Sequence, residues 1–139
     1  MIDPANVPPV SDDELLARYI LQSSHIRGSD RSLKPDAFIP HPHTDLSVTR
    51  HFMATEEELW SAGLDVATAR GKTFYGRGDF SAATCLGQRL NVEAAPLPNN
   101  PNHANVRGWP AEKPLQKIIA QQIAATARFV EAPGGTFGR

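Results

Sequence analysis

The sequence predicts an α+β fold in which a small, mostly antiparallel sheet of about three strands packs against helices, with a long C-terminal helix. Three observations support this prediction: capping-box patterns precede two helical stripes, three segments alternate apolar and polar residues, and a long apolar stripe follows near the end. Helices and strands without a regular βαβ alternation are typical of α+β domains. We expect one domain over residues 11–131, with flexible tails at 1–10 and 132–139.

The first fifty residues predict a helix, a loop and a strand. The segment Ser11-Asp-Asp-Glu14 has the form of a capping box, and the apolar residues after it fall on one helical face, so we expect a helix over 12–22. From 23 to 42 the chain is polar, contains several prolines and shows no period, which predicts a loop. Residues 45–51 alternate apolar and polar side chains, as a half-buried strand does.

The middle of the chain predicts two helices. Thr55-Glu-Glu-Glu58 is a second capping box, and the helix that it begins is expected to end at Gly71. Residues 73–75 form a short extended piece. Asp79 then caps a two-turn helix over 80–86.

Two more strands and the long helix complete the prediction. Apolar and polar side chains alternate over residues 90–94 and 103–109, which predicts two strands. The Pro- and Asn-rich turn between them predicts an antiparallel hairpin. A helix over 110–130 follows, with Pro114 in its first turn, where a missing N–H costs nothing. The alanines of this helix either pack on the protein's own sheet or mediate self-association.

Composition and charge exclude several classes of protein. The chain has 139 residues and a formal net charge of -1, so nucleic-acid binding is not expected. Its single cysteine, Cys85, forms no internal disulfide and stands among small apolar residues, as a buried thiol does. Neither a signal-peptide pattern nor an apolar stretch near the roughly 20 residues of a membrane span is visible. We therefore expect a cytoplasmic protein without membrane contact.

A histidine-rich segment offers a metal-binding hypothesis. If this segment is extended, His41, His43 and Asp45 share one face and converge on a divalent metal such as zinc, with His103 as a distant fourth ligand. The pattern resembles the opening of the HxHxDH motif of metallo-β-lactamase-fold hydrolases, but it departs from the motif at Leu46, where the motif has histidine. The resemblance implies a metal that activates water for hydrolysis.

A second candidate surface lies in the segment 99–110, which concentrates amides, one histidine, one arginine and one tryptophan. We expect His103, Asn105, Arg107 and Trp109 to form a binding surface at a sheet edge, with the indole as an aromatic anchor. Edge strands also offer unpaired backbone groups to a partner strand.

The sequence therefore favours a small, non-catalytic binding or accessory module that needs no cofactor and binds a protein partner or a second copy of itself. The alternative is a metal-dependent hydrolase, a nuclease or phosphoesterase that uses the histidine cluster. A third hypothesis is a pocket for an anionic small molecule around Arg50, Arg77 and Arg107, which requires these side chains to gather in a concave site.

Overall fold

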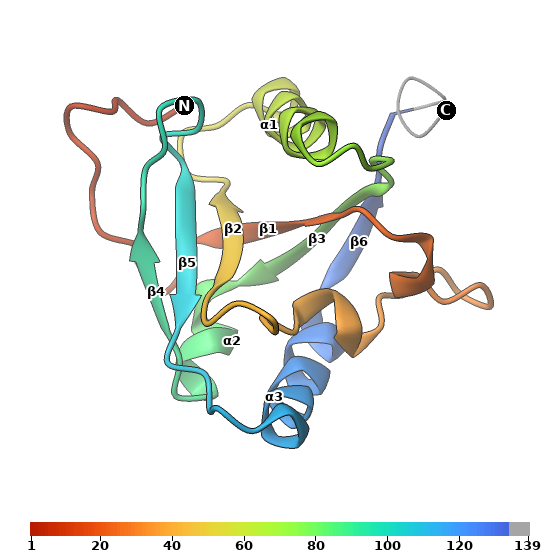
Figure 1. Cartoon of the computed structure of the whole chain (residues 1–139). Helices are drawn as coiled ribbons and strands as arrows, with labels where there is room; N and C mark the ends of the chain where they lie inside the picture. Colours follow the sequence, from red (N-terminus) through yellow and green to blue (C-terminus); the bar gives the residue numbers. More distant parts are fainter. Residues whose placement is uncertain (134–139) are drawn as a thin grey trace.

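The computed structural model describes residues 1–133 and forms a six-stranded antiparallel sheet with helices on both sides (Figure 1). The strand order is β4-β5-β2-β1-β3-β6. Helix α1 lies on one side of the sheet, and α2 and α3 lie on the other (Figure 1). In chain order the elements are β1 (Leu15–Ile20), η1 (Ser23–His25), η2 (Pro35–Phe38), β2 (Leu46–Arg50), α1 (Glu56–Ala69), β3 (Gly76–Ser81), α2 (Ala82–Gly87), β4 (Asn91–Ala94), β5 (His103–Arg107), α3 (Lys113–Thr126) and β6 (Arg128–Glu131).

The α+β class agrees with the structure, but the predicted sheet of about three strands is wrong. The expected helix over 12–22 is strand β1, which pairs with β2 on one side and with β3 along its whole length on the other. Leu16 and Ile20 are four residues apart, a spacing that fits one face of a helix and one face of a strand equally well. Pairing with two neighbouring strands decides between them.

The predicted long C-terminal helix is also wrong in its extent. Helix α3 ends at Thr126, and residues 128–131 form the edge strand β6 on β3. Asp79, expected to cap a helix, lies within β3. Ser81 caps α2 instead, because its hydroxyl accepts the backbone N–H of Ala83 at 3.1 Å.

Three predicted elements are confirmed. The strand β2 lies within 45–51, and β4 and β5 form the expected antiparallel hairpin. Helix α1 begins with the predicted capping box: Glu58 N–H donates to the Thr55 hydroxyl at 3.1 Å, and Thr55 N–H donates to the Glu58 carboxylate at 3.0 Å.

The core fills the side of the sheet that carries α2, α3 and η2. Leu16, Ile20, Val48, Phe80 and Val106 point there from four strands. They pack with apolar side chains of the covering elements, which are Ala37, Phe38, Ala82, Cys85, Ala120 and Ile123. Alternate residues of each strand face the other side, where α1 lies.

A glycine lets α1 approach the sheet closely. A Cβ atom at Gly63 would clash with the Phe74 ring and stand 2.8 Å from the Tyr19 ring. These two rings meet edge to face, with centroids 5.7 Å apart. The Tyr19 hydroxyl donates to the Leu59 carbonyl at 2.7 Å, so it ties β1 to the helix.

Within the first ten residues, which the sequence predicts as a flexible tail, several positions contact the rest of the chain. Ile2 is 2% exposed, and its N–H donates to the Asn102 side-chain carbonyl at 2.9 Å. Of the expected tail at 132–139, residues 134–139 lie outside the described part of the chain. Among residues 1–133, no helix is long and apolar enough to cross a bilayer.

Cys85 is fully buried in the core, as its apolar neighbours predict. Burial disfavours the thiolate and raises the pKa of Cys85 to about 12. Because the thiolate is the reactive form, the native protein holds this thiol in an inert state.

We expect native protein at pH 7.5 to leave Cys85 unlabelled by a thiol-specific disulfide reagent over an hour, and protein unfolded in guanidinium to react fully. The absorbance of the thiolate that the reagent releases measures the extent of labelling in the native and in the unfolded protein. Rapid labelling of the native protein would contradict this burial.

Candidate functional site

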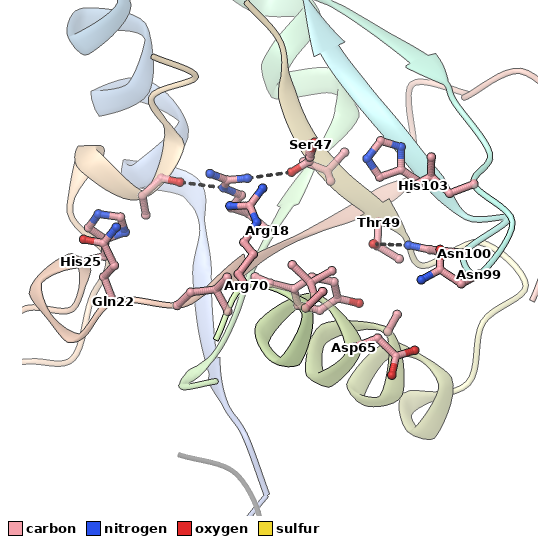
Figure 2. A pocket seen from close by; sticks show the side chains of 18 residues that line it. Arg18, Gln22, His25, Ser47, Thr49, Asp65, Arg70, Asn99, Asn100 and His103 are labelled. Carbon is pink, nitrogen blue, oxygen red and sulfur yellow. Dashed lines mark hydrogen bonds between the residues drawn. The ribbon is translucent and has the colours of Figure 1, made fainter. Parts of the chain in front are cut away.

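A pocket of about 330 Å³ opens where strands β1 and β2 diverge (Figure 2). The two strands are paired at Leu16 with Arg50 and at Ala17 with Thr49. Past this point the pocket separates them, and its walls come from η1, η2, the C-terminal half of α1 and the loop before β5. The site therefore depends on segments that are far apart in the sequence.

Arg18 spans the gap between the diverging strands. Its Nε donates to the Ala37 carbonyl in η2 at 2.9 Å, and its Nη1 donates to the Ser47 carbonyl in β2 at 3.1 Å. Both acceptors are neutral, so the guanidinium has no carboxylate partner among the described residues. Burial, together with the nearby charge of Arg70, lowers the pKa of Arg18 to about 10, and the side chain stays protonated at neutral pH.

Arg70 brings a second guanidinium to the same place. It is the C-terminal cap residue of α1, where the helix dipole favours a cation. Figure 2 shows its side chain next to that of Arg18. Within residues 1–133 the Arg70 side chain has neither a hydrogen bond nor an ion pair. Two like charges thus meet in the pocket, and neither has an ion-pair partner among residues 1–133.

Other polar groups line the pocket on either side of the arginines (Figure 2). His25 is partly buried, and burial lowers its pKa, so its neutral form is favoured. His103 is held by a hydrogen bond of 2.8 Å between its Nδ1 and the Ala95 carbonyl. Asp65 of α1 is exposed and contributes a carboxylate to the lining of the same pocket.

A second pocket, of about 270 Å³, adjoins the first. Arg18, Ser47 and Arg70 line both pockets. The remaining lining of the second pocket comes from the loop before β2, from Leu46 on β2 and from Asn105 on β5. The arginine pair therefore lies where the two pockets meet.

The four residues predicted as a binding surface separate into two groups. His103 lines the first pocket and Asn105 lines the second. Arg107 instead forms ion pairs with Asp45 at 3.4 Å and with Glu93 at 3.2 Å. The Trp109 ring packs against the core, and its Nε1 donates to the backbone at 3.0 Å.

The expected sheet edge in this region is wrong, because β5 is an interior strand. It pairs with β4 on one side and with β2 on the other. The edges of the sheet are β4 and β6.

The structure does not bring the hypothetical metal ligands together. His41 and His43 are exposed in the loop before β2, whereas Asp45 pairs with Arg107 and His103 bonds to a backbone carbonyl. In the described part of the chain, no three His, Cys, Asp or Glu side chains gather as metal ligands do.

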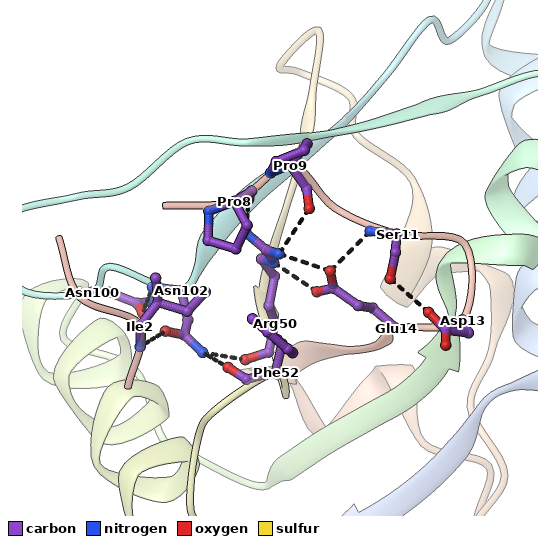
Figure 3. A network of polar contacts seen from close by, with 10 residues as sticks. All are labelled: Ile2, Pro8, Pro9, Ser11, Asp13, Glu14, Arg50, Phe52, Asn100 and Asn102. Atoms are coloured by element: carbon purple, nitrogen blue, oxygen red, sulfur yellow. Dashed lines mark hydrogen bonds and ion pairs between the residues drawn. The ribbon is translucent and has the colours of Figure 1, made fainter. Parts of the chain in front are cut away.

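The arginines of the anion-pocket hypothesis are also dispersed. Arg50 is buried and bonds Glu14 through Nε and Nη2, each at 2.7 Å (Figure 3). Arg77 is paired with Glu56 at 2.8 Å and with Asp79 at 3.0 Å. Arg107 is the exposed ion-pair residue described above. Each of these three charges is already neutralised.

Sequence reasoning missed both Arg18 and Arg70. Arg18 stands in a segment predicted as a helix, where its position relative to β2 is undefined. Arg70 precedes Gly71 at a predicted helix end, where a basic residue is ordinary. Sequence alone offers no signal that joins the two positions.

Comparison with protein-family models, with curated proteins and with solved structures finds no match for this chain.

The buried Arg50–Glu14 pair yields a stability prediction. Glu14→Ala leaves Arg50 charged and unpaired in the interior, so we expect it to cost about 3–5 kcal/mol of unfolding free energy. Urea denaturation measures the loss. The matched control is Glu131→Ala, which breaks an exposed pair with Arg31 and should cost less than about 1 kcal/mol. Equal losses of unfolding free energy in Glu14→Ala and Glu131→Ala would contradict the stabilising role of the buried Arg50–Glu14 pair.

The pKa shift of His25 yields a pH prediction. Because burial lowers the pKa of His25 in the folded state below the usual 6.5, the unfolded chain takes up the proton first. The unfolding free energy should therefore fall as the pH drops through 6.5. Comparing wild type with His25→Gln at pH 7.5 and 5.5 isolates this contribution. An identical pH response of the two proteins would contradict it.

Proposed function

We propose that this chain is a non-catalytic binding protein for a small molecule that carries a carboxylate or a phosphate. The observation that carries the proposal is the pair of adjacent guanidinium groups, Arg18 and Arg70, which share a pocket and lack a carboxylate partner among the described residues.

An anion resolves the electrostatic conflict between the two side chains. A guanidinium has five N–H donors, and Arg18 uses its Nε and Nη1 for carbonyl groups. The other donors of Arg18 and those of Arg70 are available to a ligand. Carboxylate and phosphate oxygens match this planar arrangement and form charge-assisted hydrogen bonds.

The pocket has the size and lining of a small-molecule site. Its volume of about 330 Å³ is at the lower end of the range of about 300–1,000 Å³ for ligand pockets. Apolar side chains from the sheet, α1 and the loop before β5 form part of its wall, among them Val48, Val66 and Leu97. A compact apolar or aromatic body suits this wall, with its anion at the arginines.

Binding without catalysis is the favoured activity because an activated nucleophile is lacking in the described part of the site. The Tyr19 hydroxyl is bonded to the Leu59 carbonyl, and burial raises the pKa of Tyr19 to about 12. Neither His25 nor His103 is hydrogen-bonded to a hydroxyl or thiol side chain. An adjacent base of this kind is the usual activator of a serine or cysteine nucleophile.

The proposal keeps the cytoplasmic location expected from the sequence. A protein partner or self-association also stays a prediction, and exposed apolar side chains of α3, Leu115 and Ile118, are the candidate contacts. We do not propose a metal-dependent hydrolase, because its ligand residues lie apart.

Removal of one guanidinium tests the anion site. Phenyl phosphate and benzoate should each raise the melting temperature of the wild type, and neutral benzyl alcohol at the same concentration should not. We expect Arg70→Gln to weaken binding of both anions at least tenfold, since a hydrogen bond to a charged group contributes about 1.5–3 kcal/mol. Titration followed by NMR gives the dissociation constants.

Arg89→Gln is the matched control. It removes the same charge from an exposed turn outside both pockets, and it should bind both anions as the wild type does. If neither anion binds the wild type, or if Arg70→Gln and Arg89→Gln bind them equally, the proposed function is wrong.

A further inference from the structure

The position of the arginine pair constrains the ligand beyond its charge. Arg18 and Arg70 are lining residues of both pockets, and Ser47 is the third shared residue. A group bound by the two guanidiniums therefore has space on two sides, about 330 Å³ on one and about 270 Å³ on the other.

The two spaces differ in chemistry. The first has an apolar wall that includes Val48, Ala62 and Val66. The second is lined mostly by polar side chains of the loop before β2 and of the neighbouring strands, which are His43, Thr44, Asp45, Ser47 and Asn105. An apolar or aromatic body fits the first, and a body rich in hydroxyl groups fits the second, where amide, hydroxyl and carboxylate groups offer hydrogen bonds.

The chemistry of common anions narrows the choice. A carboxylate is joined to one carbon atom, so it fills both pockets only if the molecule branches directly beside the anion. A phosphate monoester has the same limit. A phosphodiester is joined to two organic groups and still carries a negative charge, so it fits an anion site that has space on both sides.

We propose that the ligand is a small phosphodiester whose phosphate binds Arg18 and Arg70 and joins an apolar or aromatic body in the first pocket to a polar body in the second. This inference rests on the proposed function and specifies the ligand class of the same site. The near-neutral net charge of -1 favours a small molecule over a nucleic-acid strand with the same linkage.

Three probes separate the roles of charge and shape. Phenyl phosphate is a monoester, methyl phenyl phosphate is a diester without a polar body, and phenyl glyceryl phosphate is a diester with one. We expect the wild type to bind phenyl glyceryl phosphate at least tenfold more tightly than methyl phenyl phosphate, although both carry one negative charge. Calorimetric or NMR titration measures the three dissociation constants.

Variants of the second pocket test where the polar body binds. Asn105→Leu should reduce the affinity for phenyl glyceryl phosphate to that for methyl phenyl phosphate. Thr44→Val, in the exposed loop, should reduce it severalfold and serves as a second test if Asn105→Leu fails to fold. Asn91→Leu makes the same substitution on β4, outside both pockets, and should keep the wild-type affinity.

The outcomes distinguish this inference from the proposed function. If phenyl phosphate binds through Arg70 but the glyceryl diester binds no better than the methyl diester, the phosphodiester class is wrong and the anion site stands. If neither benzoate nor any of the three phosphate probes binds in a way that depends on Arg70, both proposals are wrong. If benzoate alone binds in that way, the phosphodiester class is wrong and the anion site stands. Binding of a ten-nucleotide oligothymidylate more than tenfold tighter than that of phenyl glyceryl phosphate, and dependent on Arg70, would overturn the small-molecule class.

Discussion

The ion pair between Glu14 and Arg50 joins the residue before β1 to the last residue of β2. Here the two strands are hydrogen-bonded, with Leu16 opposite Arg50. Arg50 also donates to the carbonyls of Pro8 and Pro9, so the same side chain holds the N-terminal segment (Figure 3). Farther along, the strands separate and Arg18 occupies the space between them. The pocket exists because the two strands are joined at one end and diverge at the other.

The arginines of this protein differ in what neutralises them. Arg50 and Arg77 each have carboxylate partners, whereas Arg18 and Arg70 have none in the described residues. A net charge close to zero therefore hides a local excess of positive charge. Sequence reasoning identified part of the site through His103, which stands in a segment rich in amides. It missed the arginine pair, because two residues fifty-two positions apart are brought together by tertiary structure alone.

The elements that could be predicted have local signals. The capping box of α1 and the turn between β4 and β5 are examples, since hydrogen bonds between near neighbours form them. The missed strands lack such signals. Strand β3 (Gly76–Ser81) contains two glycines, which are depleted in strands. Strand β6 follows α3 directly, without a proline or glycine to mark the helix end. The apolar residues of strand β1 have a spacing that fits both a helix and a strand. Its two partner strands decide its conformation.

The interior position of β1 has a consequence for how the chain is made. Ribosomes add about 5–20 residues per second, and Ser81, at the end of β3, is 61 positions after Ile20. On the nascent chain β1 thus waits about 3–12 s for a complete neighbour on that side. During this time the backbone N–H and C=O groups on the β3 side of β1 lack their hydrogen-bond partners. Pairing between such distant segments is slow to form, because the long loop has to close before any contact stabilises it.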